Sequence, residues 1–166
     1  MSDDDPEQAF RQSGWPGLRA RLFHIYFVLR RPMTLGVRGL VRDPANNSIF
    51  LIRHTYVPGW QLPGGGVEAG ETMEEALARE IAEEGNIVLA GPPRLISIHH
   101  NRHASRRDHV GFYLVEQFRQ TAPKQPDHEI AEAGFFPLDA LPDGVTPATL
   151  RRIREVFEEA TVSPHW

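Results

Sequence analysis

The 166-residue sequence contains no cysteine, and this absence excludes several kinds of chemistry at once. Without a thiol there is no disulfide framework, no thiolate nucleophile and no cysteine-ligated zinc or iron–sulfur site. With 40% hydrophobic and 24% charged residues, a chain of this length buries an adequate core as one globular domain without covalent or metal cross-links.

Lysine is almost as scarce. Of the 18 lysines and arginines, 17 are arginines and only Lys124 is a lysine. The net charge of −4 gives no excess of positive charge, so the composition does not favour binding to duplex nucleic acid. Codon usage accounts for such a bias, and the functional alternative is a surface whose guanidinium groups bind phosphates in a forked geometry.

Long hydrophobic runs are also missing. The longest, Leu22–Leu29, is interrupted by His24 and is far shorter than the ~20 residues of a membrane-spanning helix. The acidic start, Met1–Pro6, lacks the basic and then apolar order of a secretory signal. We therefore expect a cytoplasmic protein without a membrane span.

The pattern along the chain predicts two regions, an N-terminal tail with an apolar helix or strand at 1–31 and a main domain at 32–162. In the first region, apolar residues recur at spacings of three and four before Pro32, which favours a helix. These residues are Leu18, Leu22, Ile25, Tyr26 and Leu29.

Beyond Pro32 the pattern changes to that of strands, with a turn at 43–47. Strands are predicted at 33–41, 48–55, 94–100 and 109–118, and a short strand followed by a turn is predicted at 133–141. One helix is predicted from about Thr72 to Glu84, and a last helix has Thr146 as its N-cap and Pro147 at its first position. The order strands, helix, strands, helix predicts an α+β fold with helices packed on a mixed sheet.

Three carboxylates gather on one face of the helix predicted at 72–84. At about 100° per residue, Glu80, Glu83 and Glu84 fall within one ~100° arc. This arc borders the predicted apolar stripe of Met73, Leu77 and Ile81, whereas Glu75 points to the opposite, solvated side. Like charges so close repel, and burial adds to the cost. A hard divalent cation compensates for such a cluster, and a solvated acidic face is the ordinary alternative.

The spacing of these residues resembles the signature of the Nudix hydrolases, Gly-x5-Glu-x7-Arg-Glu-apolar-x-Glu-Glu-x-Gly-apolar. Six fixed residues match in place, namely Gly65, Glu71, Arg79, Glu80, Glu83 and Glu84. A chance match at a given position is on the order of one in ten million. The closing glycine is replaced by Asn86, the next-best residue for a left-handed turn that ends a helix. The resemblance covers roughly residues 33–160 and implies an α/β/α sandwich, the Nudix fold with a mixed β-sheet between helices.

The resemblance implies a pyrophosphohydrolase that requires Mg²⁺ or Mn²⁺ and cleaves a nucleoside diphosphate linked to another moiety. Sugar nucleotides, ADP-ribose-like compounds and nucleoside triphosphates all fit this description. The implied metal ligands are the carbonyl of Gly64 and the carboxylates of Glu80, Glu83 and Glu84, and the number of metal ions stays open. Arg79 would orient a neighbouring carboxylate, and Glu71 would brace the loop.

The general base implied by the resemblance is a glutamate, either Glu83 of the helix or one on the later acidic loop, Glu129 or Glu132. We favour Glu129 over Glu132. A solvated acidic loop is the alternative for both.

A basic stretch at 94–109 complements the acidic helix, with four arginines against one aspartate. The candidate phosphate-binding residues are Arg53, Arg102, Arg106 and Arg107. Trp60 is a candidate for stacking on a base, as are Tyr56 and Phe112, although core positions are the more common interpretation for each. The irregular spacing of the histidines in this stretch, without cysteine or acidic ligands, argues against a transition-metal site.

Two other functions are weighed against hydrolysis. A Nudix-fold nucleotide-binding or regulatory module without turnover is disfavoured because binding alone does not require all three glutamates. A role at RNA ends is disfavoured by the absence of a basic tail. The predicted partner is therefore a small nucleoside diphosphate derivative, and the resemblance favours a homodimer with the stripe Leu18–Leu29 as a candidate interface.

Overall fold

The computed structural model describes residue 26 and residues 32–166 of the chain. The chain divides into two units, residues 1–33 and residues 34–166, and the elements below belong to the second. The predicted helix at 18–29 lies outside the described residues except for Tyr26, which is helical and exposed. The division into 1–31 and 32–162 therefore stays a prediction.

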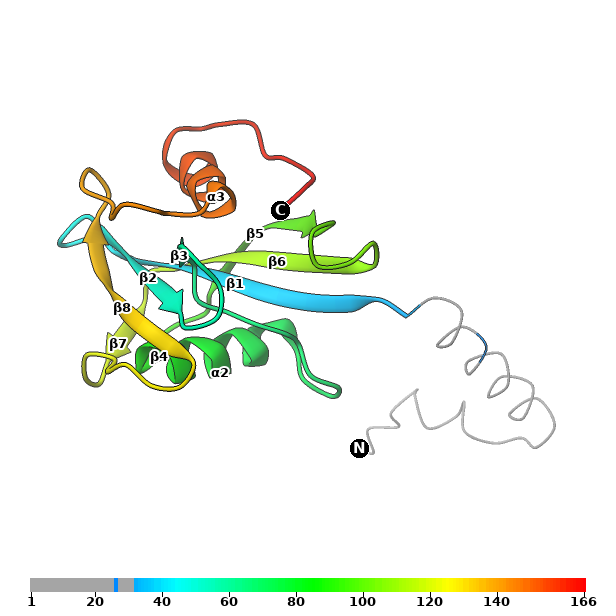
Figure 1. Cartoon of the computed structure of the whole chain (residues 1–166), viewed down its shortest axis with the longest axis horizontal. Coiled ribbons are helices and arrows are strands. Elements are labelled where there is room, and N and C mark those ends of the chain that lie inside the picture. Colours follow the sequence, from blue (N-terminus) through cyan, green and yellow to red (C-terminus); the bar gives the residue numbers. More distant parts are fainter. Residues whose placement is uncertain (1–25, 27–31) are drawn as a thin grey trace, which may run out of the picture. The chain divides into compact units, whose positions relative to one another are not determined.

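Eight strands and two helices make up the unit at residues 34–166 (Figure 1). Among them, no helix is long and apolar enough to cross a membrane. In chain order the elements are β1 (Thr34–Asp43), β2 (Ser48–His54), β3 (Trp60–Gln61), α2 (Met73–Gly85), β4 (Ile87–Leu89), β5 (Arg94–His100), β6 (Asp108–Val115), β7 (Phe118–Gln120), β8 (Ile130–Pro137) and α3 (Pro147–Phe157).

The central sheet is mixed, as predicted. Its strands follow the order β3-β2-β1-β6-β5, with β8 paired to β2, and only β1 and β6 are parallel. Strand β2 pairs with β1 at just two positions, Arg42 with Ile49 and Asp43 with Ser48. Farther along β2, the short strand β3 pairs with Ile52 and Arg53 instead. The sheet therefore splits between β1 and β2.

Helices α2 and α3 cover opposite faces of this sheet (Figure 1). One buried cluster contains Leu77 and Ile81 of α2 with Val37 of β1, and another contains Ile153 of α3 with Leu40 of β1. Residues of one strand thus divide between two cores because side chains alternate across a sheet. The α/β/α sandwich is confirmed.

The ends of α2 follow from local sequence. Thr72 is the N-cap, and its hydroxyl accepts a hydrogen bond from the backbone of Glu75 while the Glu75 carboxylate accepts one from the backbone of Thr72. Glu75 is exposed, as predicted. It also completes this capping box, a role that the sequence analysis did not predict. At the other end Asn86 has φ 54° and ψ 33°, the left-handed conformation predicted for it.

Sequence patterns did not reveal the three short strands β3, β4 and β7. The predicted strand at 109–118 ends at Val115, and Phe118 begins β7, which pairs with β4 in a separate two-stranded sheet. Strands of two or three residues are too short for an alternating pattern to be recognised.

The left-handed turn at Asn86 gives the first prediction. Asn86→Ala should lower the free energy of unfolding by about 1 kcal/mol, because a Cβ without a polar group to offset it is disfavoured at positive φ. Asn86→Gly should leave stability unchanged or raise it. Urea unfolding of both variants measures the difference, and equal losses would contradict the role of the turn.

Candidate functional site

A glycine-rich loop fills the gap where β1 and β2 separate. Backbone N–H groups of Val37 and Gly39 in β1 donate to the carbonyls of Gly65 (2.8 Å) and Pro63 (2.9 Å). The loop therefore runs beside β1 like a further strand. Gly64 lies between these contacts with φ +137°, and a Cβ there would overlap the carbonyl oxygen of Val37. Only glycine fits this position.

Two carboxylates of α2 lie against this loop. The Glu84 carboxylate accepts a 2.7 Å hydrogen bond from the backbone N–H of Gly64. The Glu80 carboxylate lies where a Cβ on Gly65 would be. Their side chains are only 9% and 15% exposed, so two acidic groups flank the Gly64–Gly65 backbone in a largely buried setting.

Arg79 ties the motif residues together. Its guanidinium donates to Glu71 at 2.9 and 3.1 Å, to Glu80 at 2.8 Å and to the carbonyl of Gly66 at 3.0 Å. Hydrogen bonding to Arg79 is the main cause that lowers the pKa of Glu71, which also accepts a bond from the backbone of Glu68. Hydrogen bonds to the carboxylates of Glu71 and Glu80 raise the pKa of Arg79. Arg79 thus fixes the orientation of Glu80 and the path of the loop.

Glu84 is the most perturbed carboxyl near the loop. Burial raises its pKa to about 7, against the smaller opposing effects of Arg38 and of the Gly64 hydrogen bond. The nearest histidine nitrogen, Nε2 of His54, lies 3.7 Å from Glu84 Oε1. Burial, with a further contribution from Arg38, lowers the pKa of His54. The histidine is therefore neutral at neutral pH and does not balance the charge of Glu84.

Arg38 and His54 were missed by the sequence analysis, and so was Tyr56 as a neighbour of the carboxylates. Arg38 donates to the carbonyl of Leu62 at 3.0 Å, just before the glycine loop. The Tyr56 ring lies 5.0 Å from the His54 ring. Two features of the sequence could have indicated these residues. Arg38 is a charged residue inside an otherwise apolar strand, and His54 is a histidine near the end of the next strand.

The donor set at the loop suits a hard divalent cation, because it consists of carboxylate oxygens beside a close-approaching glycine backbone. Glu80 and Glu84 are the two carboxylates in contact with that backbone. Glu83 is 61% exposed and lies 3.6 Å from Arg79. The described residues contain no preformed group of three acidic or histidine side chains that could hold a metal ion. Glu83 is therefore not grouped with Glu80 and Glu84 in this structure.

Lys124 fastens the acidic loop to the end of α2. Its ammonium donates to the carbonyl of Glu83 at 2.8 Å and to Asp127 at 2.6 Å. Asp127 in turn accepts hydrogen bonds from the backbone of Glu129 and Ile130, and the Lys124 bond is the main cause that lowers the pKa of Asp127. The backbone that carries Glu129 is therefore held relative to α2.

The two glutamates of that loop differ in their surroundings. The charge of Glu129 adds, after burial, to the raised pKa of Tyr56, and it adds less than burial and Glu80 do to the raised pKa of Glu84, so the exposed Glu129 lies within electrostatic reach of both groups. Glu132 instead forms a 2.7 Å ion pair with Arg53, its cross-strand neighbour, and both side chains are about half exposed.

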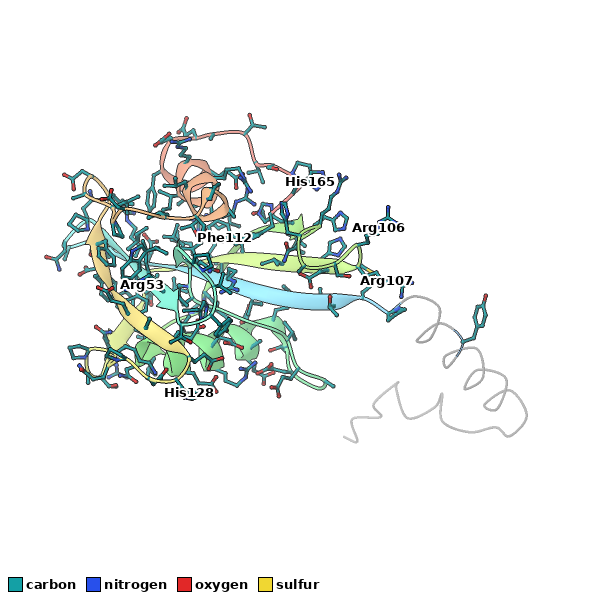
Figure 2. The ribbon with its side chains drawn as sticks, in the orientation of Figure 1. Arg53, Arg106, Arg107, Phe112, His128 and His165 are labelled. Carbon is teal, nitrogen blue, oxygen red and sulfur yellow. The ribbon has the colours of Figure 1, made fainter. Side chains whose placement is uncertain are left out.

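The predicted substrate-binding residues lie in three places. Arg53 is paired with Glu132, and its guanidinium lies 5.7 Å from the ring centre of Trp60, which is buried in the core. Arg102, Arg106 and Arg107 belong to the exposed loop between β5 and β6. Figure 2 shows Arg106 and Arg107 at the far end of the sheet from Arg53 and His128.

A cavity of about 330 Å³ lies beside the first turn of α3. Its lining includes Arg38 and Leu62 near the glycine loop, Thr149 and Arg151 of α3, Asn101 and Trp166. Arg38 thus borders the cavity while its charge also acts on Glu84.

Comparison with known proteins places this arrangement in a family. The NUDIX domain model matches residues 32–157. The crystal structure of a MutT NUDIX hydrolase from Burkholderia pseudomallei matches with a TM-score of 0.63 and 29% identity, over 74% of this chain and 97% of that one.

Two curated relatives are similar over shorter lengths. An ADP-ribose pyrophosphatase from Methanocaldococcus jannaschii is 33% identical over 111 residues, which are 65% of this chain and 64% of the relative. The MutT4 protein of Mycobacterium tuberculosis (strain CDC 1551 / Oshkosh) is 35% identical over 105 residues, 60% of this chain and 41% of the relative. The chain thus spans less than two thirds of either relative.

The glycine loop offers a matched pair of substitutions. Gly64→Ala should lower the free energy of unfolding by about 3 kcal/mol, because the new Cβ overlaps the β1 backbone at a positive φ. Gly66→Ala should change it by less than about 0.5 kcal/mol, because a Cβ there meets nothing within 4 Å. Chemical denaturation measures both, and equal effects would contradict the close approach at Gly64.

Glu84 makes the stability of the metal-free protein depend on pH. Its pKa is about 7 in the fold against an ordinary 4.5, so the folded state holds the proton more tightly. The contribution of the Glu84 carboxyl to the free energy of unfolding is fully present below about pH 4.5 and is lost as the pH rises through 7. With a chelator present, Glu84→Gln should exceed wild type by about 2 kcal/mol at about pH 8 and equal it at about pH 4.5. A pH-independent difference in denaturation experiments would contradict this.

Proposed function

This chain belongs to the Nudix hydrolase family, and on that basis we propose that it hydrolyses a diphosphate that joins a nucleoside to another group. The observation that carries the proposal is the placement of Glu80 and Glu84 on the Gly64–Gly65 backbone. Carboxylate oxygens are the ligands that a hard divalent cation prefers, and the chain has no thiol that would bind a softer metal. This placement therefore supports the use of Mg²⁺ or Mn²⁺.

The residues that would hold the cation are Glu80, Glu84, Glu83 after rotation, and the carbonyl of Gly64. A bound divalent cation would neutralise phosphate oxygens and lower the pKa of a water molecule. Arg79 keeps the Glu80 carboxylate aimed at the loop through its 2.8 Å bond. Glu71 holds Arg79 and the loop backbone, so both residues position the site and do not need to contact the phosphates.

Glu129 is the general base in this proposal, in preference to Glu83 and Glu132. Its charge acts on Glu84 and Tyr56, and Lys124 holds its loop against α2. Glu132 is engaged by Arg53 in a 2.7 Å ion pair, so its carboxylate already has a partner. The role of Glu129 is to take a proton from the attacking water while the phosphorus centre is attacked in line.

The substrate is proposed to extend from the glycine loop into the cavity beside α3. Arg38 borders both regions, which places a cation between the carboxylates and the cavity. Asn101 and His103 line the cavity from the β5–β6 loop, so Arg102, Arg106 and Arg107 of that loop are candidates for contacts with the outer phosphate or sugar. Several substrates fit a site divided between the glycine loop and the cavity. They are nucleoside diphosphate derivatives, such as ADP-ribose or a sugar nucleotide, and nucleoside triphosphates.

The homodimer and the cytoplasmic location predicted from the sequence belong to the same proposal. Sedimentation of the full chain tests the first, and fractionation of cells tests the second. The candidate interface at Leu18–Leu29 lies outside the described residues apart from Tyr26.

Product release from a panel of nucleotides tests the proposed activity. ADP-ribose, a sugar nucleotide and nucleoside triphosphates are incubated with wild type in Mg²⁺ or Mn²⁺. We expect turnover of at least one class, a fall in kcat of about 100-fold or more for Glu84→Gln, and a similar fall for Glu129→Gln.

Glu132→Gln is the matched control on the same loop, and its kcat should stay within about threefold of wild type. Loss of activity in Glu132→Gln but not in Glu129→Gln would reverse the assignment of the base. Nucleotide binding without turnover in wild type would instead support the alternative, a binding or regulatory module.

A further inference from the structure

The last residues of the chain form a strap along the edge of the sheet. The N–H of His100 in β5 donates to the carbonyl of Pro164 at 2.9 Å, and the N–H of Trp166 donates to the carbonyl of His100 at 3.2 Å. These bonds make a parallel bridge between His100 and His165. We call residues 161–166 the tail strap. It lies beyond residues 32–157, which match the family domain.

A buried polar network fixes the tail strap to α3 and β5. The Glu155 carboxylate accepts bonds from Arg152 at 2.6 Å and from the backbone N–H of Ser163 at 2.9 Å. The carbonyl of Ser163 accepts a 2.7 Å bond from His99 Nδ1, and Arg152 also contacts His99. Arg152 and His99 are completely buried. Burying such groups is costly unless they are paired, so the network defines one position for the strap.

Trp166 is the residue that this network places in the cavity wall. Its ring centre lies 5.3 Å from the guanidinium carbon of Arg152, 5.6 Å from the His99 ring and 6.2 Å from the Phe112 ring. Its carbonyl accepts a 2.8 Å bond from Arg151. The indole is therefore held on several sides before any ligand binds.

The rest of the cavity supplies what a nucleobase requires. The polar residues Gln61, Asn101 and Thr149 line the cavity, where the Asn101 amide also donates to Asp108 and the Thr149 hydroxyl accepts from Thr146, and Arg38 marks the end nearest the glycine loop. A rigid aromatic wall with a few convergent polar groups is the usual composition of a site for a flat heteroaromatic ring. Base–aromatic stacking also tolerates different bases, because each base has a π-face.

We propose that Trp166 stacks on the nucleobase of the substrate, so that the tail strap completes the base-binding cavity. This inference rests on the proposed function, because it assumes that the diphosphate lies at the glycine loop. It assigns a substrate-binding residue to a segment outside the matched family domain.

Calorimetric binding of nucleoside monophosphates in the presence of a chelator tests the proposal without turnover. Trp166→Ala should weaken binding by roughly 10- to 100-fold, and Trp166→Phe by less. Val162→Ala, at an exposed position of the same strap, should bind like wild type. Ribose 5-phosphate, which lacks a base, should bind equally to all four proteins.

Unchanged nucleotide affinity in Trp166→Ala, or an equal loss for ribose 5-phosphate, would overturn the proposal, as would failure of wild type to bind any nucleoside monophosphate. Circular dichroism checks the fold, and if Trp166→Ala unfolds, the affinity of Trp166→Phe for the two ligands decides. Tight base-dependent binding by a wild type that hydrolyses nothing would support Trp166 while refuting the proposed activity.

Discussion

The separation of β1 from β2 is the constraint on which the rest of the site depends. Two residue pairs join these strands before they part, and the glycine loop enters the space that they leave. A side chain at Gly64 would close that space, so the backbone itself becomes the surface on which the carboxylates of Glu80 and Glu84 lie. A continuous sheet would have paired these edges and left no such surface.

The carboxylates near the glycine loop differ in whether an ion-pair partner offsets their burial. Glu71 and Glu80 both form ion pairs with Arg79, so each of these two carboxylates has a cationic partner. Burial of Glu84 outweighs the charge of Arg38 and the hydrogen bond from the Gly64 backbone, so its ionised form is disfavoured in the metal-free fold. The structure thus keeps one buried carboxylate, Glu84, that gains from a cation, beside two carboxylates that already share a guanidinium.

The sequence was informative where the determinants are local. Thr72, Asn86 and Thr146 define helix ends through their own side chains or backbone, and all three were predictable. The spacing of the motif glutamates was equally local. Arg38 and His54 were not predictable as site residues, because they reach Glu84 only through the splitting of the sheet. Strands β3, β4 and β7 escaped for a different reason, since strands of two or three residues are too short to show an alternating pattern.

The scarcity of lysine has a consequence for covalent chemistry. Lys124 is the single side-chain amine in the sequence; its side chain is 13% exposed, and its ammonium joins the carbonyl of Glu83 to Asp127. Acylation at that nitrogen would remove its charge and its salt-bridge donor, and so would free the loop that carries Glu129 from the end of α2. The 17 arginines are not targets of such reagents, so an amine-directed modification acts on one side chain, and that side chain lies at the site.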